Sequence, residues 1–264
     1  MLYAEVKVSI SKKPLIVISN DDGIKAKGIK ALYSEFIKFA DVFVIAPESE
    51  KSGASHSVTI HKHLKVKKVK FADASGYSVS GTPADCVKLA IFNLCKRTPD
   101  IVVSGINHGP NYGKFIIYSG TVGAATEAAL LGIPSVAASI NDYEKNADFK
   151  RAAEITGDIV KNVLSGKVKI KKYSLLNINV PASTVKIKGV KVTHKANDEF
   201  REKYLEKKHK GKTVYFWHVV ERVRLKGPAS DIDWVDGGYV TVTPLHFDLT
   251  DRKTLKQLKI RLQK

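Results

Sequence analysis

The sequence lacks the features that would place it in a membrane, on a secretory route or among zinc proteins. No apolar run approaches the roughly 20 residues that a membrane-spanning helix needs. Residues 1–7 hold no basic stretch followed by a long apolar one, so no secretion signal is expected. No cysteines and histidines cluster at zinc-finger spacing. We therefore expect a cytoplasmic protein that does not enter a membrane.

Cysteine is scarce, with only Cys86 and Cys95 in the chain. The surrounding pattern predicts one helix that carries both residues, nine positions apart. At about 100° per residue this spacing puts the two thiols on opposite faces, where they cannot pair. We expect both to be small core residues in a reducing compartment.

Motifs of several enzyme classes are also missing. No G-x-G-x-x-G follows a predicted strand, which argues against a dinucleotide-dependent dehydrogenase. Gly23 and Gly28 have P-loop spacing, but the Lys-Ser/Thr pair is absent after them. The carboxylates at positions 21 and 22 are adjacent, which argues against phosphatases that use a D-x-D pair. Neither H-E-x-x-H nor G-x-S-x-G occurs.

Acidic residues are outnumbered, and the formal net charge of the 264-residue chain is +18. Lysine is concentrated in 61–70, 167–172 and 201–212. The positive electrostatic field of these lysines attracts anionic partners such as nucleotides, polyphosphate or nucleic acid. Two of the runs alternate Lys with aliphatic residues, which is typical of a strand with one solvated face. Because few aromatic residues lie in the runs, we favour a lysine-rich surface over specific nucleic-acid binding.

The first two-thirds of the chain alternates short apolar runs with helical patterns. This alternation predicts an α/β fold, a three-layer α/β/α, Rossmann-like arrangement around a mostly parallel sheet. We take residues 1–182 as its catalytic core. The predicted strands are 15–18, 42–45, 101–103, 135–140 and 175–180, and the predicted helices are 26–40, a helix capped by Thr82, 121–131 and 147–164.

The alternation of apolar runs and helical segments ends at Pro181. Residues 186–194 alternate, and a highly charged stretch then leads to an aromatic strand at 213–220, with 207–212 as the tip of a long hairpin. Such a strand would be poorly buried by itself. We therefore interpret 183–264 as an oligomerisation arm, a β-hairpin/helix extension that completes the same domain.

Three polar clusters directly follow predicted buried strands, at 20–23, 48–55 and 104–107. The carboxyl ends of parallel strands share one sheet edge, where ligands of α/β folds bind. Adjacent carboxylates Asp21 and Asp22 repel each other unless a cation compensates, and Mg²⁺ or Mn²⁺ prefers oxygen ligands. Ser52 and Asn107 would add neutral oxygen atoms. The alternative is a simple polar turn.

A further polar cluster lies at 118–125, where Ser119, Gly120 and Thr121 begin an Ala-rich helix. Free N–H groups and hydroxyls at a helix start can bind an anion, and ordinary helix capping is the alternative. Beside a metal site, phosphate binding is the better interpretation.

These clusters predict how phosphate would be handled. A metal would polarise a phosphate oxygen and position a water for attack. Donors for the phosphoryl group would be Ser104 and Gly105 together with residues 119–121. Asn20 would orient phosphate or support its loop, and one carboxylate, Asp21 or Asp22, would also act as base or nucleophile.

The motifs resemble the SurE family of survival-protein nucleotidases over nearly the whole chain. The matching segments, in order, are 20–24 with 28–29, 46–47, 52–53, 57–59, 81–87, 104–107 with Gly109, Asn111 and Gly113, 118–125 and 238–245. The resemblance implies a metal-dependent 5′/3′-nucleotidase or acid-phosphatase-like enzyme, with polyphosphatase activity in some members.

The resemblance also assigns residues and assembly. Asp21, Asp22, Ser52 and Asn107 match the family's metal-site positions, with one divalent ion, Mg²⁺ or Mn²⁺, per subunit. The family forms dimers or tetramers through its C-terminal region, so a homodimer or homotetramer is expected. Two residues depart from the pattern: Lys27 replaces the usual Pro, and Lys114 stands where an acid is common.

The expected activity is hydrolysis of nucleoside 5′-monophosphates, with 3′-monophosphates as further substrates. The alternatives are a broad acid phosphatase or exopolyphosphatase and, from another class, a non-catalytic nucleic-acid-binding protein or a structural protein. The preferred base, the phosphate position and the native metal stay open.

Overall fold

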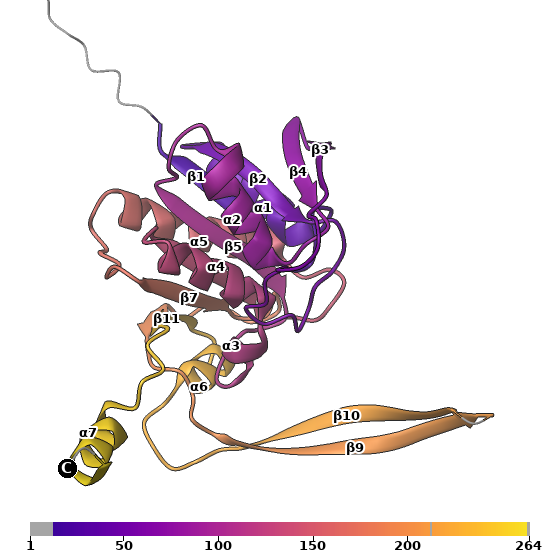
Figure 1. The fold of residues 1–264 in the computed structure, drawn as a ribbon, viewed down its shortest axis with the longest axis vertical. Coiled ribbons are helices and arrows are strands. Elements are labelled where there is room, and N and C mark those ends of the chain that lie inside the picture. Colours follow the sequence, from indigo (N-terminus) through magenta and orange to yellow (C-terminus); the bar gives the residue numbers. More distant parts are fainter. Residues whose placement is uncertain (1–12, 212, 263–264) are drawn as a thin grey trace, which may run out of the picture.

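The structure is a computed structural model that describes residues 13–211 and 213–262. Nine strands in that part of the chain form one sheet in the order β3-β4-β2-β1-β5-β6-β7-β11-β8 (Figure 1). Neighbours run parallel except at β3–β4 and β7–β11. The strands are β1 (Leu15–Ser19), β2 (Asp41–Pro47), β3 (Val66–Phe71), β4 (Ala74–Val79), β5 (Ile101–His108), β6 (Ser135–Ile140), β7 (Ser174–Val180), β8 (Val190–Val192) and β11 (Val240–His246).

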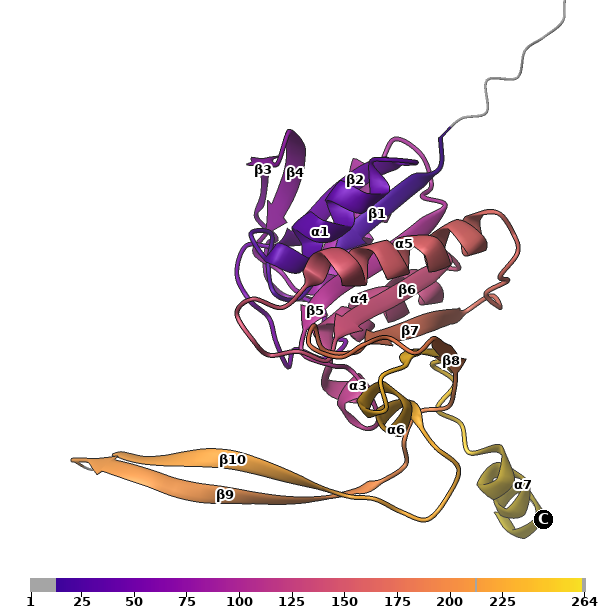
Figure 2. The ribbon, with the colours of Figure 1, turned by 180° about the vertical axis from the view of Figure 1, so that it is seen from behind.

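Helices cover both faces of this sheet (Figures 1 and 2). Ile16 and Ile18 of β1 lie in one apolar cluster with α1 (Lys27–Phe36) and α5 (Phe149–Leu164). Val17, which points to the opposite face, packs with α2 (Pro83–Leu89) and α4 (Gly120–Leu130). A strand buried on both faces needs a continuous apolar run, which is the pattern that predicted it. The three-layer, mostly parallel architecture is confirmed.

The capped helix at Thr82 is also confirmed. The Thr82 hydroxyl accepts a hydrogen bond from the Asp85 backbone, and the Asp85 carboxylate accepts one from the Thr82 backbone, which makes a capping box. A π-helical turn, η1 (Ala90–Leu94), follows α2. Cys86 and Cys95 are both free thiols, as predicted, and Cys86 is buried. The prediction that one helix carries both is wrong, because Cys95 follows the end of η1 in extended backbone and is half-buried.

Three segments differ from the predicted secondary structure. The first helix ends at Phe36 rather than Ala40. The lysine-rich segment 167–172 has no regular structure, whereas its alternation predicted a strand. The strand predicted at 101–103 continues to His108, because its extension still pairs with β6 across an irregularity at Gly105 and Ile106.

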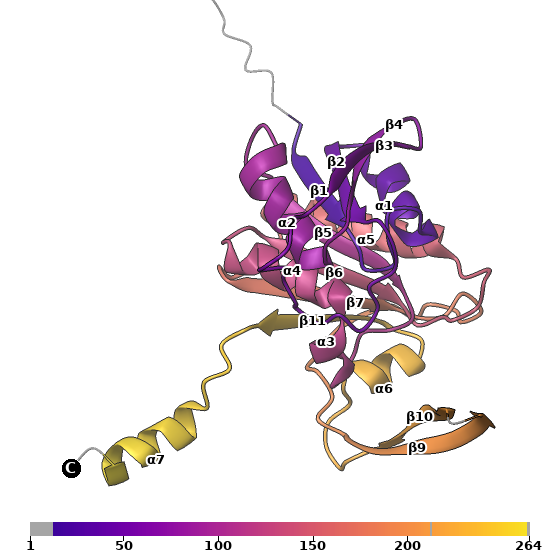
Figure 3. The same cartoon turned by 45° about the vertical axis from the view of Figure 1, so that its right-hand side comes forward.

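Beyond β8 the chain forms a long two-stranded hairpin, β9 (Glu199–Lys210) and β10 (Thr213–Val223). The hairpin and α7 (Arg252–Leu262) both stand away from the sheet (Figure 3). Large side chains are exposed on these two elements: Tyr204, Tyr215, Phe216, Trp217, Leu258, Ile260 and Leu262. The predicted hairpin is confirmed, but its tip begins later than predicted, because β9 continues to Lys210, and residue 212 lies outside the described residues. Its role in assembly stays a prediction. Among the described residues, no helix combines the length and apolarity that crossing a membrane requires.

The base of the hairpin is fastened to α6 (Asp231–Asp236) by an ion pair between Arg222 and Asp233. Burial raises the pKa of Asp233, but hydrogen bonds from Ser230 and Arg222 outweigh it and lower the pKa to about 2. An acid with a lowered pKa stabilises the fold above its unfolded-state pKa, and this contribution disappears as the pH falls through the folded-state value.

We therefore expect Asp233→Asn to lower the free energy of unfolding by about 2 kcal/mol at pH 7 and by almost nothing near pH 2. Urea unfolding at pH 7, 4 and 2 measures this difference. Asp158→Asn, on an exposed part of α5, is the control and should change stability by less than about 0.5 kcal/mol at pH 7. An equal loss of unfolding free energy at pH 7, 4 and 2 would contradict the lowered pKa of Asp233.

Candidate active site

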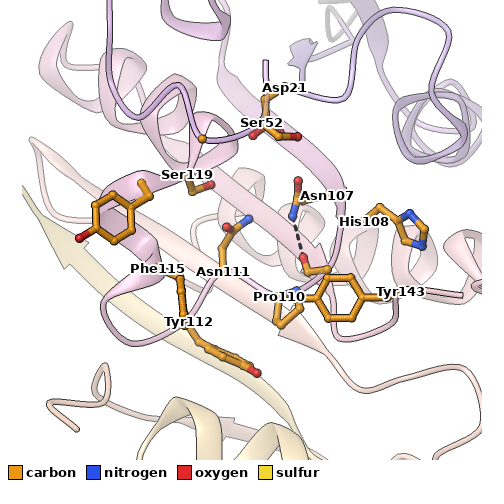
Figure 4. A pocket seen from close by; sticks show the side chains of 13 residues that line it. Asp21, Ser52, Asn107, His108, Pro110, Asn111, Tyr112, Phe115, Ser119 and Tyr143 are labelled. Carbon is orange, nitrogen blue, oxygen red and sulfur yellow. Dashed lines mark hydrogen bonds between the residues drawn. The ribbon is translucent and has the colours of Figure 1, made fainter. Parts of the chain in front are cut away.

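Four of the predicted site residues meet at the carboxyl edge of the parallel strands. Asp21 follows β1, Ser52 follows β2, Asn107 lies near the end of β5, and Ser119 is the N-cap of α4. All four line one cavity of about 380 Å³ (Figure 4). The sheet thus brings together residues that are up to a hundred positions apart.

Asp21 is buried, with 3% of its surface exposed. Its carboxylate accepts a hydrogen bond from the Thr121 hydroxyl. Burial raises its pKa, and hydrogen bonds from the Thr121 side chain and from the backbone of Gly120 and Thr121 oppose this rise. The anion at the start of α4 is therefore the carboxylate of Asp21 itself.

Asp22 is partly buried and accepts a hydrogen bond of 3.3 Å from the backbone N–H of His108. Burial and the adjacent negative charge of Asp21 raise its pKa to about 6, although the His108 hydrogen bond opposes the rise. Asp22 lines a neighbouring cavity of about 370 Å³, to which His108 also contributes. Within the described residues, neither aspartate forms an ion pair with a basic side chain.

Asn107 and Ser52 add neutral oxygen atoms beside these carboxylates. The Asn107 amide nitrogen donates to the Gly109 carbonyl at 2.6 Å. Its Oδ1 is directed toward Ser52 and has no hydrogen-bond partner among the described residues (Figure 4). The backbone N–H of Lys51 donates to the Asp21 carbonyl at 2.7 Å and fixes the Ser52 loop beside Asp21. The Ser52 hydroxyl donates to Glu50 at 2.8 Å.

This donor set fits a hard divalent cation. No group of three or more His, Cys, Asp or Glu side chains in the described chain could hold a metal by itself, so an ion here needs amide or hydroxyl ligands as well. In the part of the chain that the structure describes, two adjacent carboxylates without a cationic partner lie next to an unpaired amide oxygen and provide such a set for Mg²⁺ or Mn²⁺. Soft-metal ligands are absent from the residues that line this cavity.

The residues predicted to bind phosphate also make hydrogen bonds within the protein. The side-chain amide of Asn20 both donates to and accepts from the Gly23 backbone, at 3.0 and 3.1 Å, so it shapes the Asp21–Asp22 loop. Thr121 supports Asp21. Ser119 caps α4 by accepting from the Val122 N–H at 3.0 Å, and its side chain lines the cavity.

Ser104 and Gly105 do not lie in a loop, because β5 extends through them. Ser104 is fully buried, and its hydroxyl has no hydrogen-bond partner among the described residues. Neither residue lines the cavity.

Sequence reasoning missed the far wall of the cavity. Its lining includes His108, Pro110, Tyr112, Phe115 and Tyr143, beside Tyr118 of the predicted cluster 118–125. The density of aromatic residues at 112–118 was a usable signal. Tyr143 lies on the separate β6–α5 connection, and only the fold brings it to the cavity.

Buried amides hold the wall in place. The backbone N–H of Asn111 donates to Asn179 at 2.8 Å, and its side chain donates to Ser139 at 2.9 Å. Asp231 of α6, which is fully buried, accepts from the Gly113 N–H at 3.0 Å. The C-terminal segment therefore supports the cavity through α6.

Comparisons with known proteins show that the chain is similar to one family. The family model described as "Survival protein SurE" matches residues 16–202. A "5′-nucleotidase SurE" of Syntrophomonas wolfei is 41% identical over 249 residues, covering 92% of this chain and 93% of the relative. A "5′/3′-nucleotidase SurE" of Proteus mirabilis is 40% identical over 251 residues, covering 94% and 96%. The crystal structure of the SurE protein from Aquifex aeolicus superposes with a TM-score of 0.80 at 38% identity, covering 94% of this chain and 99% of that one.

Proposed function

The chain belongs to the SurE family of survival proteins, and from that premise we propose that it is a divalent-metal-dependent 5′-nucleotidase. It hydrolyses nucleoside 5′-monophosphates to nucleoside and phosphate, and it also accepts 3′-monophosphates, as the name of the Proteus mirabilis relative suggests. The observation that carries the metal requirement is the pair of adjacent carboxylates, Asp21 buried and Asp22 half-buried, which have no basic partner in the described chain.

The residues that would hold the ion are Asp21, Asp22, Ser52 and Asn107. For Ser52 the hydroxyl would turn from Glu50 toward the carboxylates, which its exposed position permits. The bound ion would act as a Lewis acid on a phosphate oxygen and lower the pKa of a water molecule.

The protein's own groups position the substrate. Ser119 is the N-cap of α4 and lines the cavity, so its hydroxyl would donate to a phosphate oxygen while its oxygen accepts from the Val122 N–H. The buried Asp21 is held by Thr121, so the carboxylate needs little rearrangement during the reaction.

Lys114 does not line the cavity. Its ammonium group pairs with Glu202 of the hairpin and lies 4.5 Å from the centroid of the Phe200 ring. Lys114, which departs from the family pattern, therefore contributes to the contact between α3 (Phe115–Tyr118) and the base of the hairpin.

A phosphate-release assay tests the proposal. Purified protein is mixed with nucleoside 5′- and 3′-monophosphates in the presence of Mn²⁺, Mg²⁺ or excess chelator. We expect release with either ion and none with chelator. Full activity in chelator would contradict the metal requirement. Absence of turnover together with tight, steeply salt-dependent binding of nucleic acid would favour the non-catalytic alternative.

Two further parts of the proposal concern the protein as a whole. We place it in the cytoplasm, a location that its two unpaired cysteines support. We also propose a homodimer or homotetramer, supported by the exposed aromatic residues of the hairpin. Light scattering of the purified protein measures the oligomeric state.

A further inference from the structure

Ser52 lies in a tight turn of the loop that follows β2. The backbone N–H of Ala54 donates to the Lys51 carbonyl at 3.1 Å and closes this turn, and Gly53 adopts a φ of 73°, a conformation that favours glycine. On the entry side of the turn, the N–H of Lys51 donates to the Asp21 carbonyl at 2.7 Å. The Ser52 side chain itself is exposed, so the position of its oxygen depends on how the chain is held on both sides of the turn.

On the exit side of the turn, the chain packs against α3 and the backbone of α4. The N–H of Ser55 donates to the Tyr118 carbonyl at 3.0 Å, and its hydroxyl donates to the Ile117 carbonyl at 2.6 Å. A side-chain carbon added at Gly123 of α4 would lie 2.5 Å from the Ser55 carbonyl oxygen. Glycine at this position therefore lets the helix approach the backbone of the loop directly.

The next residue of the loop, His56, contacts a buried carboxylate of the same helix. Glu127 of α4 is 5% exposed, and its carboxylate lies 2.7 Å from Nε2 of His56 and 3.1 Å from the ammonium group of Lys88 on α2. Burial raises the pKa of Glu127, but the hydrogen bonds from His56 and Lys88 outweigh burial and lower it. Because an ionised carboxylate only accepts hydrogen bonds, Nε2 of His56 carries a hydrogen and donates it.

Helix α4 thus contacts both sides of the proposed metal site. The Thr121 hydroxyl in its first turn donates to the Asp21 carboxylate. Glu127, about two turns further along, holds His56 of the loop. From this arrangement we propose that His56 is a positioning residue for the metal site, and that its contact with Glu127 fixes the Ser52 turn against α4. The inference rests on the proposed function, because it takes Asp21 and Ser52 as ligands of one divalent ion.

The test measures Mn²⁺ binding without substrate, from the electron paramagnetic resonance signal of the free ion. Residues that orient metal ligands typically change metal affinity by 10- to 100-fold, and His56 acts through the backbone of the turn, so we expect His56→Ala to raise the Kd for Mn²⁺ about tenfold. His56→Gln keeps an N–H donor of similar reach and should stay within about threefold of the wild type.

Lys88→Met is the matched control. It removes the other partner of the Glu127 carboxylate, on α2 rather than on the loop. Both His56→Ala and Lys88→Met should lower the Tm, because each leaves a buried carboxylate with one partner fewer. Only the substitution in the loop should weaken Mn²⁺ binding, and Lys88→Met should leave the Kd within about twofold of the wild type.

The loop should stay attached in His56→Ala. The N–H and hydroxyl of Thr59 donate to the Asp85 carboxylate at 3.0 and 2.7 Å, so the loop is also anchored at the start of α2. An unchanged Kd in His56→Ala, or an equal rise in Lys88→Met, would overturn the inference alone. Absence of Mn²⁺ binding by the wild type would overturn the proposed metal requirement and the inference with it.

Discussion

Asp22→Asn is expected to reduce metal-dependent phosphate release by about a thousandfold while leaving the fold intact. The substitution keeps the shape of the side chain and removes one of the two charges available to the cation. Charge stabilisation by a bound metal is worth several kcal/mol, and each 1.4 kcal/mol corresponds to tenfold in rate. Phosphate release from a nucleoside 5′-monophosphate, measured over a range of Mn²⁺ concentrations, gives the loss.

Stability supplies a second measurement that does not depend on turnover. The pKa of Asp22 is raised to about 6, so between pH 4 and 6 the unfolded chain loses a proton that the folded protein retains. The fold therefore becomes less stable as the pH rises through this range, and the full effect is present above pH 6. Without metal at pH 7.5, we expect Asp22→Asn to be more stable than the wild type by about 2 kcal/mol, and the difference to vanish below pH 4.

Added metal should reverse this order. An ion that binds only the folded state stabilises it in proportion to the logarithm of its concentration. Mn²⁺ should therefore raise the Tm of the wild type and have a much smaller effect on Asp22→Asn. Asp158→Asn, on the exposed part of α5, is the matched control and should respond like the wild type. Equal Tm shifts in all three proteins would contradict the metal assignment at Asp22.

The central sheet could be predicted because local pattern and tertiary environment agree. The runs at 15–18, 42–45 and 135–140 are apolar on both sides, and a parallel strand covered by helices buries both sides. Once the strands were known to be parallel, the meeting of Asp21, Ser52 and Asn107 at one edge followed. Placing these three residues at one edge of the sheet required no knowledge of side-chain contacts.

The rest depends on partners that are distant in sequence. The alternation at 167–172 predicts a strand, but no neighbouring strand pairs with it in the described structure. The start of α4 was recognised as a possible anion site, but its contact with Asp21 could not be inferred, because residues 21 and 121 are a hundred positions apart and meet only in the folded protein. Tyr143 was missed for the same reason, because its own segment carries no pattern that points to the cavity.

The close approach of α4 to Asp21 leads to a further expected result, a loss of about a hundredfold in kcat/KM on Gly120→Ala. Gly120 is the first residue of α4 and is buried. A β-carbon at this position would lie 2.8 Å from Cβ of Asp21 and 2.9 Å from its Oδ2. Carbon atoms do not approach this closely, so the carboxylate or the helix start must move, and misplacement of a reacting group by about 1 Å can reduce the rate about a hundredfold.

The same substitution should separate positioning from folding. Alanine has a higher helix propensity than glycine, and this gain partly offsets the strain, so we expect the free energy of unfolding to fall by no more than about 2 kcal/mol. Gly227→Ala is the matched control, because a β-carbon there meets no atom within 4 Å and activity should stay unchanged. If Gly120→Ala retained full activity and the wild-type response to Mn²⁺, the position of the Asp21 carboxylate would not limit the reaction. A hundredfold loss with a nearly unchanged Tm would mean that the helix start sets the geometry of the metal site, since the substitution alters no metal ligand.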